Sequence, residues 1–276
     1  MRKTLLLISL FLSKMAFSQV VESDSVRKSM VADTSIAEPM LLEKPDLSVF
    51  DTLSYAEEYK RDIWRFTIGV RGGLSRGRYT LQEETINKVG STGLPVLDEN
   101  GKVVKNRFIN NATFNSGYNV GLVFRFVRGS FYTQPEIGFS QKAGRFDILN
   151  NDGSLYKRVN GKINAIDIPI LVGIRFRDAR FFFGPTVNFA YKMNSEMKSA
   201  LKEYTQESKL NHEFFTRPIM NFMVGLGFEF KNMFFDLRYE KGLNSYTQET
   251  LGSSNSPAPF KLLVDGIHLN IGFLKK

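Results

Sequence analysis

Eight segments of the sequence alternate apolar and polar residues with a period of two, and this pattern restricts the fold more than any other feature. In MFFDLRYEKG (233–242), Phe235 and Leu237 would point to one side of a strand, and Asp236 and Arg238 to the other. Water could meet the charged side and a protein core the apolar side, or lipid could meet the apolar side and a narrow polar lumen the charges. The predicted strands cover residues 64–74, 117–127, 130–141, 163–175, 179–190, 219–230, 232–242 and 264–274.

The lengths of the strands and of their connections indicate a membrane barrel. A tilted strand needs about 9–11 residues to cross the hydrocarbon layer, and every segment reaches that length. Short connections (128–129, 176–178 and 231) alternate with long ones (75–116, 142–162, 191–218 and 243–263). In an up-and-down barrel this places all short turns at one end, as in transmembrane barrels, where that end is periplasmic. We therefore predict an all-β fold, an eight-stranded antiparallel up-and-down transmembrane β-barrel.

The two faces of the predicted strands differ sharply in charge. The face that includes Leu237 carries no charged residue, and a Lys or Arg there would cost about 2–4 kcal/mol at the bilayer midplane. Lipid should meet this face. The opposite face carries five basic and five acidic residues, which we expect to form a structural ion-pair network that plugs the lumen. They are Arg65, Arg71, Arg125, Glu136, Asp167, Arg175, Glu229, Asp236, Arg238 and Glu240.

The N-terminal region differs in composition from the rest of the chain. MRKTLLLISLFLSKMAFSQ has a basic start, a short apolar run and small residues before Gln19, so residues 1–18 are predicted to be a secretory signal peptide. Residues 19–63 contain ten acids and five bases and are expected to form a mostly disordered periplasmic leader. Residues 64–276, with a net charge of +11, form the predicted barrel domain.

Few residues suggest chemistry. The sequence has no cysteine and two histidines, and it shows no metal-ligand cluster or nucleotide-binding loop. His268 is predicted to face the lumen near carboxylates, whereas a hydrolase acting on membrane lipid would need His and Ser on the lipid-facing rim. His212 lies in the long 191–218 connection. We expect no catalytic, cofactor-binding or metal site, and no nucleic-acid partner for an exported chain without a binding motif.

Several strand motifs resemble those of the PorT-type outer-membrane β-barrels, small "porin family" barrels of bacteria that carry type IX secretion. The motifs occur in the same order and are TQPEIGFSQKAG (133–144), AIDIPILVGIRF (165–176), FFFGPTVNF (181–189), MVGLGFEF (223–230) and FFDLRYEKGL (234–243). The resemblance covers about residues 64–276. One departure is the C-terminus, where Leu274, Lys275 and Lys276 follow Phe273 in place of a terminal aromatic residue. The resemblance implies the barrel fold and the outer membrane, and it suggests an association with type IX secretion.

These observations predict a non-enzymatic outer-membrane barrel that acts as a structural or assembly component. The leader and the C-terminus should lie in the periplasm. Expected partners are outer-membrane lipids and lipopolysaccharide, whose phosphates could bind the basic loop 142–162, and periplasmic or secretion-system proteins. The alternatives are an outer-membrane lipid-modifying enzyme, a small ligand-binding or channel barrel, and a secreted lipocalin-like carrier.

Overall fold

The computed structural model of the chain describes residues 63–205, 217–247 and 250–275. The predicted signal peptide, the leader up to residue 62 and His212 lie outside the described residues. Within the described part of the chain, no helix combines the length and the apolar character that crossing a bilayer requires.

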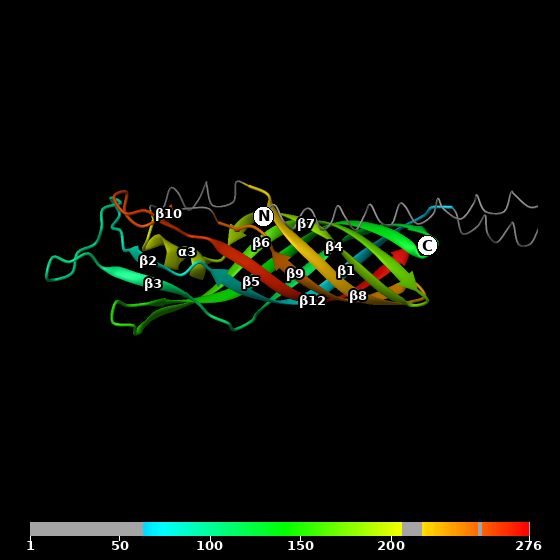
Figure 1. Ribbon diagram of the computed structural model, residues 1–276, viewed down its shortest axis with the longest axis horizontal. Coiled ribbons are helices and arrows are strands. Elements are labelled where there is room, and N and C mark those ends of the chain that lie inside the picture. The colour runs from blue at the N-terminus through cyan, green and yellow to red at the C-terminus, as the bar shows by residue number, and fades with distance from the viewer. Residues whose placement is uncertain (1–62, 206–216, 248–249, 276) are drawn as a thin grey trace, which may run out of the picture. The chain divides into compact units, whose positions relative to one another are not determined.

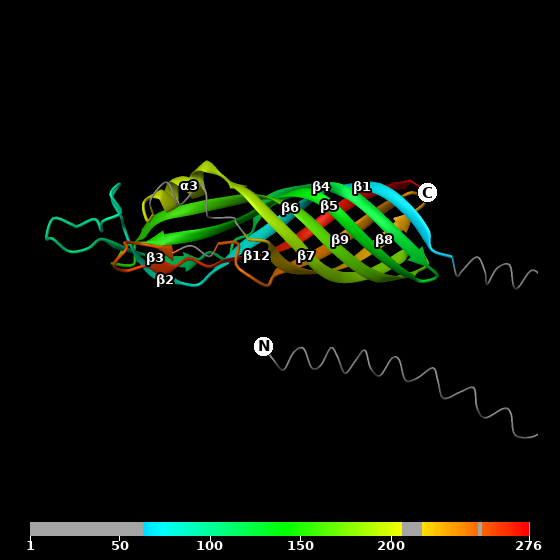
Figure 2. The same cartoon turned by 90° about the horizontal axis from the view of Figure 1, so that it is seen from above.

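Eight antiparallel strands close into a ring, which confirms the predicted barrel (Figures 1 and 2). The ring runs β1-β4-β5-β6-β7-β8-β9-β12, and β12 pairs back with β1. The strands are β1 (Arg65–Leu81), β4 (Asn115–Arg128), β5 (Phe131–Leu149), β6 (Leu155–Phe176), β7 (Ala179–Met193), β8 (Ile219–Phe230), β9 (Met233–Gly242) and β12 (Leu262–Lys275).

Short turns join the strands at one end of the ring, as the alternating connection lengths predict. Two residues separate β4 from β5, β6 from β7, and β8 from β9. The first residue of each turn, Gly129, Arg177 or Lys231, has a positive φ of 53–57°. This backbone matches the twist of a tight hairpin, and glycine adopts it with less strain than arginine or lysine.

Side chains alternate between the two sides of the barrel wall. On β9, Leu237 is 53% exposed, and its neighbour Arg238 is only 1% exposed. Leu237 lies beside Leu226 of β8 and Leu269 of β12 in the register, and both are exposed as well. An apolar outer belt therefore surrounds a charged interior.

The strands extend further than the sequence pattern predicts at the end with long connections. The prediction that 142–162 is a basic loop is wrong, because β5 and β6 continue as a paired hairpin and only residues 150–154 connect them. The expected loop 75–116 contains the end of β1, β2 (Glu84–Asn87) and β3 (Lys105–Asn110), and β3 pairs with β5. The expected loop 191–218 contains α3 (Ser195–Lys202).

These elements form a cap, defined here as residues 82–110, 142–162, 195–205, 243–247 and 250–262. The last range contains the two-stranded sheet of β10 (Thr250–Leu251) and β11 (Ala258–Pro259). Four buried rings, Phe108, Phe146, Tyr204 and Phe260, pack together with centroids 4.9–6.1 Å apart. Burial of such rings is among the largest favourable terms available to a small core. The long connections thus form an ordered apolar core of their own.

Tyr79 of β1 joins the apolar core of the cap to the barrel. Its ring lies against Gly144 of β5 and Gly161 of β6, which are partners in the register. A Cβ at either glycine would come within 2.3 Å of the ring, so only glycine fits both positions. Tyr79 therefore seals the boundary between the charged lumen and the apolar core.

Candidate functional site

The barrel interior holds a layer of alternating arginine and carboxylate side chains, called here the arginine layer. Strand alternation points one or two residues of each contributing strand into the lumen. All but Glu229 are nearly completely buried. The layer consists of Arg71 of β1, Arg125 of β4, Glu136 of β5, Arg180 of β7, Glu229 of β8, and Asp236 and Arg238 of β9.

Arg238 and Glu136 form the centre of the arginine layer. The Arg238 guanidinium binds Glu136 in a bidentate manner, with Nη1–Oε2 and Nη2–Oε1 distances of 2.8 and 2.9 Å. Nη2 also lies 2.7 Å from Asp236 Oδ2, and Arg71 Nε lies 2.6 Å from Glu136 Oε2. Charge-assisted bidentate pairs of this type are strong and fix the planes of both groups.

The second half of the arginine layer links β4, β7 and β8. Arg180 binds Asp236 and lies 3.2 Å from Glu229 Oε1 through its Nε. Arg125 also binds Glu229. The amide oxygen of Gln134 accepts hydrogen bonds from Arg125 Nε at 2.7 Å and Arg180 Nη1 at 3.1 Å. Each of these arginines therefore has acceptors on more than one strand.

A second group, the lysine cluster, lies further along β5 and β9. Lys142 Nζ is 2.6 Å from Glu240 Oε2 and 3.0 Å from Asp167 Oδ2. His268 Nε2 is 2.9 Å from Glu240 Oε2, and Asn221 Nδ2 donates to Glu240 Oε1 at 2.6 Å. Asn188 Nδ2 donates to the same Oε1 at 3.4 Å, so one carboxylate contacts four different side chains.

Both groups cross the barrel from one wall to the other. β5 and β9 are four places apart in the eight-stranded ring, so they face each other across the lumen. The Glu136–Arg238 pair and the Lys142–Glu240 pair each join these two strands. An eight-stranded barrel has an interior only wide enough for side chains to fill. The lumen is therefore closed by ion pairs at two levels.

The structure places the predicted lumen residues in three locations. Arg71, Arg125, Glu136, Glu229, Asp236 and Arg238 meet in the arginine layer, and Asp167 and Glu240 belong to the lysine cluster. The remaining two lie at the end with short turns. Arg65 is the exposed first residue of β1, and Arg175 has a 37% exposed side chain 3.9 Å from Glu229.

Two interior cations were not among the predicted lumen residues. Arg180 shares the inward parity of its strand with Phe182, so the alternation itself could have identified it. Lys142 shares the parity of Glu136, but it lies one residue beyond the predicted end of that strand. With these two in place of Arg65 and Arg175, the interior again holds five basic and five acidic side chains.

The geometry at His268 bears on the lipid-hydrolase alternative. Its ring is buried in the lumen and engaged with Glu240, and its register partner on β1 is Ser75, which is also buried. A lipid in the bilayer meets the outer face of the wall, on the other side from these groups. Among the described residues, no group of three or more His, Cys, Asp or Glu is arranged to hold a metal ion.

A separate ion cluster holds the cap together outside the membrane-spanning segments. Glu203 lies 2.9 Å from Lys88 Nζ and 2.7 Å from the Tyr156 hydroxyl, and its backbone oxygen accepts from the Val89 amide at 3.0 Å. Partial burial raises the pKa of Glu203, but the hydrogen bonds from Lys88 and Tyr156 outweigh it, so the net pKa is lowered. Partial burial lowers the pKa of Lys88, but its hydrogen bonds with Tyr156 and Glu203 outweigh this effect, so the net pKa is raised.

This cluster predicts that the cap loosens in acid. A carboxyl whose pKa is lower in the folded state stabilises the fold above its unfolded pKa, near 4.3, and that stabilisation is lost as the pH falls through the folded pKa. Hydrogen exchange at Val89 and its neighbours, corrected for the intrinsic rate, should therefore accelerate below about pH 4. Glu203→Gln should show the faster exchange already at pH 7, whereas the exposed Glu99→Gln should not. Equal behaviour of the two variants would contradict this role for Glu203.

Comparisons with known proteins agree with the fold. The profile of the family described as "Outer membrane protein beta-barrel domain" matches residues 56–248. The comparison with curated proteins gave no match. Among solved structures, Neisserial surface protein A (NspA) is similar at 7% identity and a TM-score of 0.35, covering 77% of this chain and 99% of that one.

Two further barrels show weaker likeness. The TodX monoaromatic hydrocarbon channel (a deltaS2 mutant) has 11% identity and a TM-score of 0.24, over 75% of this chain and 49% of that one. The translocator domain of the autotransporter NalP from Neisseria meningitidis has 7% identity and a TM-score of 0.20, over 81% and 96%. Likenesses at these TM-scores carry no argument about function.

Proposed function

Because the chain belongs to the outer membrane protein β-barrel domain family, we propose that it is a non-enzymatic, non-conducting barrel that serves as a structural or assembly component. The observation that carries the proposal is the pair of ion bridges between β5 and β9, which close the lumen. A barrel with a closed lumen passes no solute, so we expect a protein partner to bind the surface that the barrel presents to water. Here that surface is the cap.

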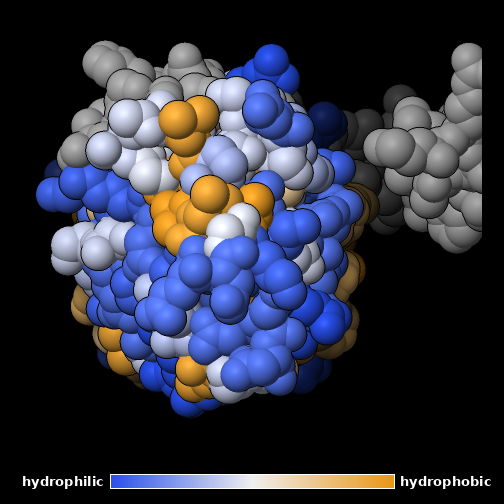
Figure 3. Space-filling model, turned by 90° about the vertical axis from the view of Figure 1, so that its left-hand side faces the viewer, coloured by the Kyte–Doolittle hydropathy of each residue, from blue (hydrophilic) through white to orange (hydrophobic). Residues whose placement is uncertain are grey.

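The proposed orientation follows from the two ends of the barrel. Short turns in bacterial barrels lie on the periplasmic side. The leader and the C-terminus would accordingly be periplasmic, and the cap would face outward. Seen from the cap end, the surface is mostly hydrophilic with a small hydrophobic area near its centre (Figure 3). Such a surface suits water and a protein partner better than lipid.

We further propose that the chain works with type IX secretion, and the support for this is the similarity of its strand motifs to PorT-type barrels. A deletion strain scored for secreted surface proteins tests the idea. Loss of secretion in that strain, restored by the intact gene, would support an assembly role. Normal secretion in the deletion strain would contradict it and leave the structural role.

The closed lumen predicts an electrically silent protein. The purified barrel, reconstituted in a planar bilayer, should give no stepwise conductance, because charged side chains from opposite walls meet in the lumen. A large general porin inserted in the same way provides the positive control. Regular conductance steps from this protein would contradict the proposal and favour the small-channel alternative.

A further inference from the structure

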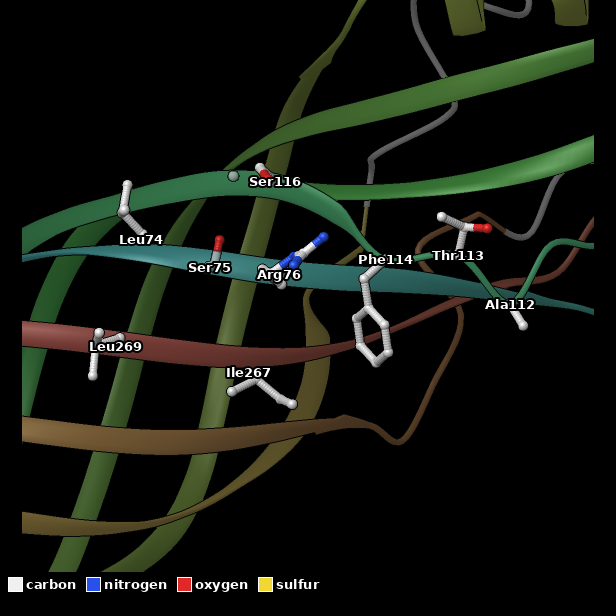
Figure 4. A pocket seen from close by; sticks show the side chains of 10 residues that line it. Leu74, Ser75, Arg76, Ala112, Thr113, Phe114, Ser116, Ile267 and Leu269 are labelled. Atoms are coloured by element: carbon white, nitrogen blue, oxygen red, sulfur yellow. The ribbon is translucent and has the colours of Figure 1, made fainter.

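A groove lies on the outer wall of the barrel at the end nearest the cap (Figure 4). It is called here the rim groove and has a volume of about 790 Å³, within the range of small-molecule sites. Its floor crosses three strands, because Leu74 of β1 pairs with Leu269 of β12, and Arg76 pairs with both Ile267 of β12 and Ser116 of β4. Leu74, Ile267 and Leu269 belong to the exposed apolar belt, so the groove is continuous with the lipid-facing surface.

The roof of the rim groove is the linker Ala112–Phe114, which runs over the wall before β4 begins. Contacts at both ends of the linker hold it in place. Asn111 Nδ2 donates to Asp147 Oδ2 of β5 at 3.0 Å, and Asn111 Oδ1 accepts from the Thr113 amide at 3.0 Å. The Phe114 ring also lies 5.9 Å from the Arg78 guanidinium. The groove is thus formed before any ligand arrives.

The charge at the rim groove is not balanced by the protein. Arg78 and Lys241 both approach Asp265, at 3.6 and 2.8 Å. Arg76 lines the groove itself and is exposed, and it has no ion pair with any described residue. A free guanidinium beside an apolar slot matches a ligand with a phosphate at one end and an alkyl chain at the other.

We propose that the rim groove binds one molecule of lipid A type, a phosphorylated and acylated glucosamine lipid. One acyl chain lies between Phe114 and the wall formed by Leu74, Ile267 and Leu269, and Arg76 binds the phosphate. The choice of lipid rests on the proposed orientation, in which the cap end meets the outer leaflet, where lipopolysaccharide replaces glycerophospholipid. The overhanging linker distinguishes this site from the rest of the belt, which any lipid can cover.

Native mass spectrometry of the full-length protein in detergent tests the site. The protein is offered equal amounts of lipid A, lipid A without its phosphates, and phosphatidylglycerol, and the lipid molecules retained per barrel are counted. We expect one retained lipid A, with the dephosphorylated form retained at least about tenfold more weakly, as the loss of one charge-assisted contact implies. Phosphatidylglycerol has a phosphodiester with a single negative charge, whereas a lipid A phosphate monoester carries more, so phosphatidylglycerol should be retained more weakly as well. Equal retention of phosphatidylglycerol would overturn the assignment to lipid A.

Three variants locate the binding. Arg76→Gln should weaken lipid A binding about tenfold by removing the phosphate contact, and Phe114→Ala should weaken it by removing the roof. The control is Lys192→Gln, which removes one exposed positive charge from β7, the strand opposite β1 in the ring. A loss in the first two variants but not in the control supports the groove.

Equal effects in all three variants would overturn the proposal, because binding would then depend on overall charge. Unchanged binding in Arg76→Gln and Phe114→Ala would overturn it as well. The fluorescence of Trp64, the only tryptophan, checks that each variant is folded. A protein that folds in lipid but shows no preference contradicts the groove alone, whereas one that does not enter lipid contradicts the membrane role.

Discussion

Replacing Glu136 with glutamine is expected to lower the free energy of unfolding by about 3–5 kcal/mol, because it leaves buried Arg71 without a counter-ion and leaves Arg238 only Asp236, which Arg180 shares. Glu136 is 2% exposed and accepts from both Arg71 and Arg238. Glutamine keeps the size of the side chain, removes its charge and replaces one acceptor oxygen with an NH2 donor. The loss should appear as an earlier urea transition in lipid vesicles, followed by the fluorescence of Trp64.

An exposed pair of the same chemistry provides the matched control. Glu83 lies 2.9 Å from Arg107 in the cap, and both side chains are more than 40% exposed. Exposed pairs contribute about 0–1 kcal/mol, so Glu83→Gln should leave the transition nearly unchanged. If the two variants unfold at the same urea concentration, water reaches Glu136 and the lumen is open. That result would also remove the main support for a non-conducting barrel.

The membrane-spanning part of the fold could be predicted from the sequence because two solvents act on every strand there. Lipid excludes charge from the outer face of the wall, and charged side chains are confined to the inner face. Alternate residues such as Leu237 and Arg238 therefore differ strongly. The same alternation contains Arg180. Arg65 and Arg175 satisfy the parity rule as well, but each lies near a strand end, where the wall meets water and a charge stays hydrated.

The cap part of β5 could not be predicted in this way, because it is covered on both faces. From Lys142 to Ile148, inward and outward residues of β5 are nearly all buried, so the alternation that marks a membrane strand is lost. The ion-pair network predicted from the sequence therefore lacks Lys142. Phe108, Phe146 and Phe260 come from three separate connections, and no local pattern indicates that they meet.

A single arginine on the outer belt is expected to destabilise the folded barrel by about 2–4 kcal/mol in lipid, and this prediction tests which solvent meets that face. Leu237→Arg is the best choice. Leu237 lies in the middle of β9, and its neighbours in the register, Leu226 and Leu269, are apolar and exposed as well. The measurement is again urea unfolding in lipid vesicles.

The control is the same substitution at Leu97 in the cap, which is 57% exposed, against 53% for Leu237. Because the two leucines expose nearly equal fractions, water alone would tolerate an arginine equally at both, within about 0.5 kcal/mol. Only a hydrocarbon environment separates them, since it penalises charge at Leu237 and is absent at Leu97. Equal stability of the two variants would mean that water meets the belt, as in a lipocalin-like carrier. A selective loss at Leu237 would mean that the uncharged face exists because lipid surrounds it.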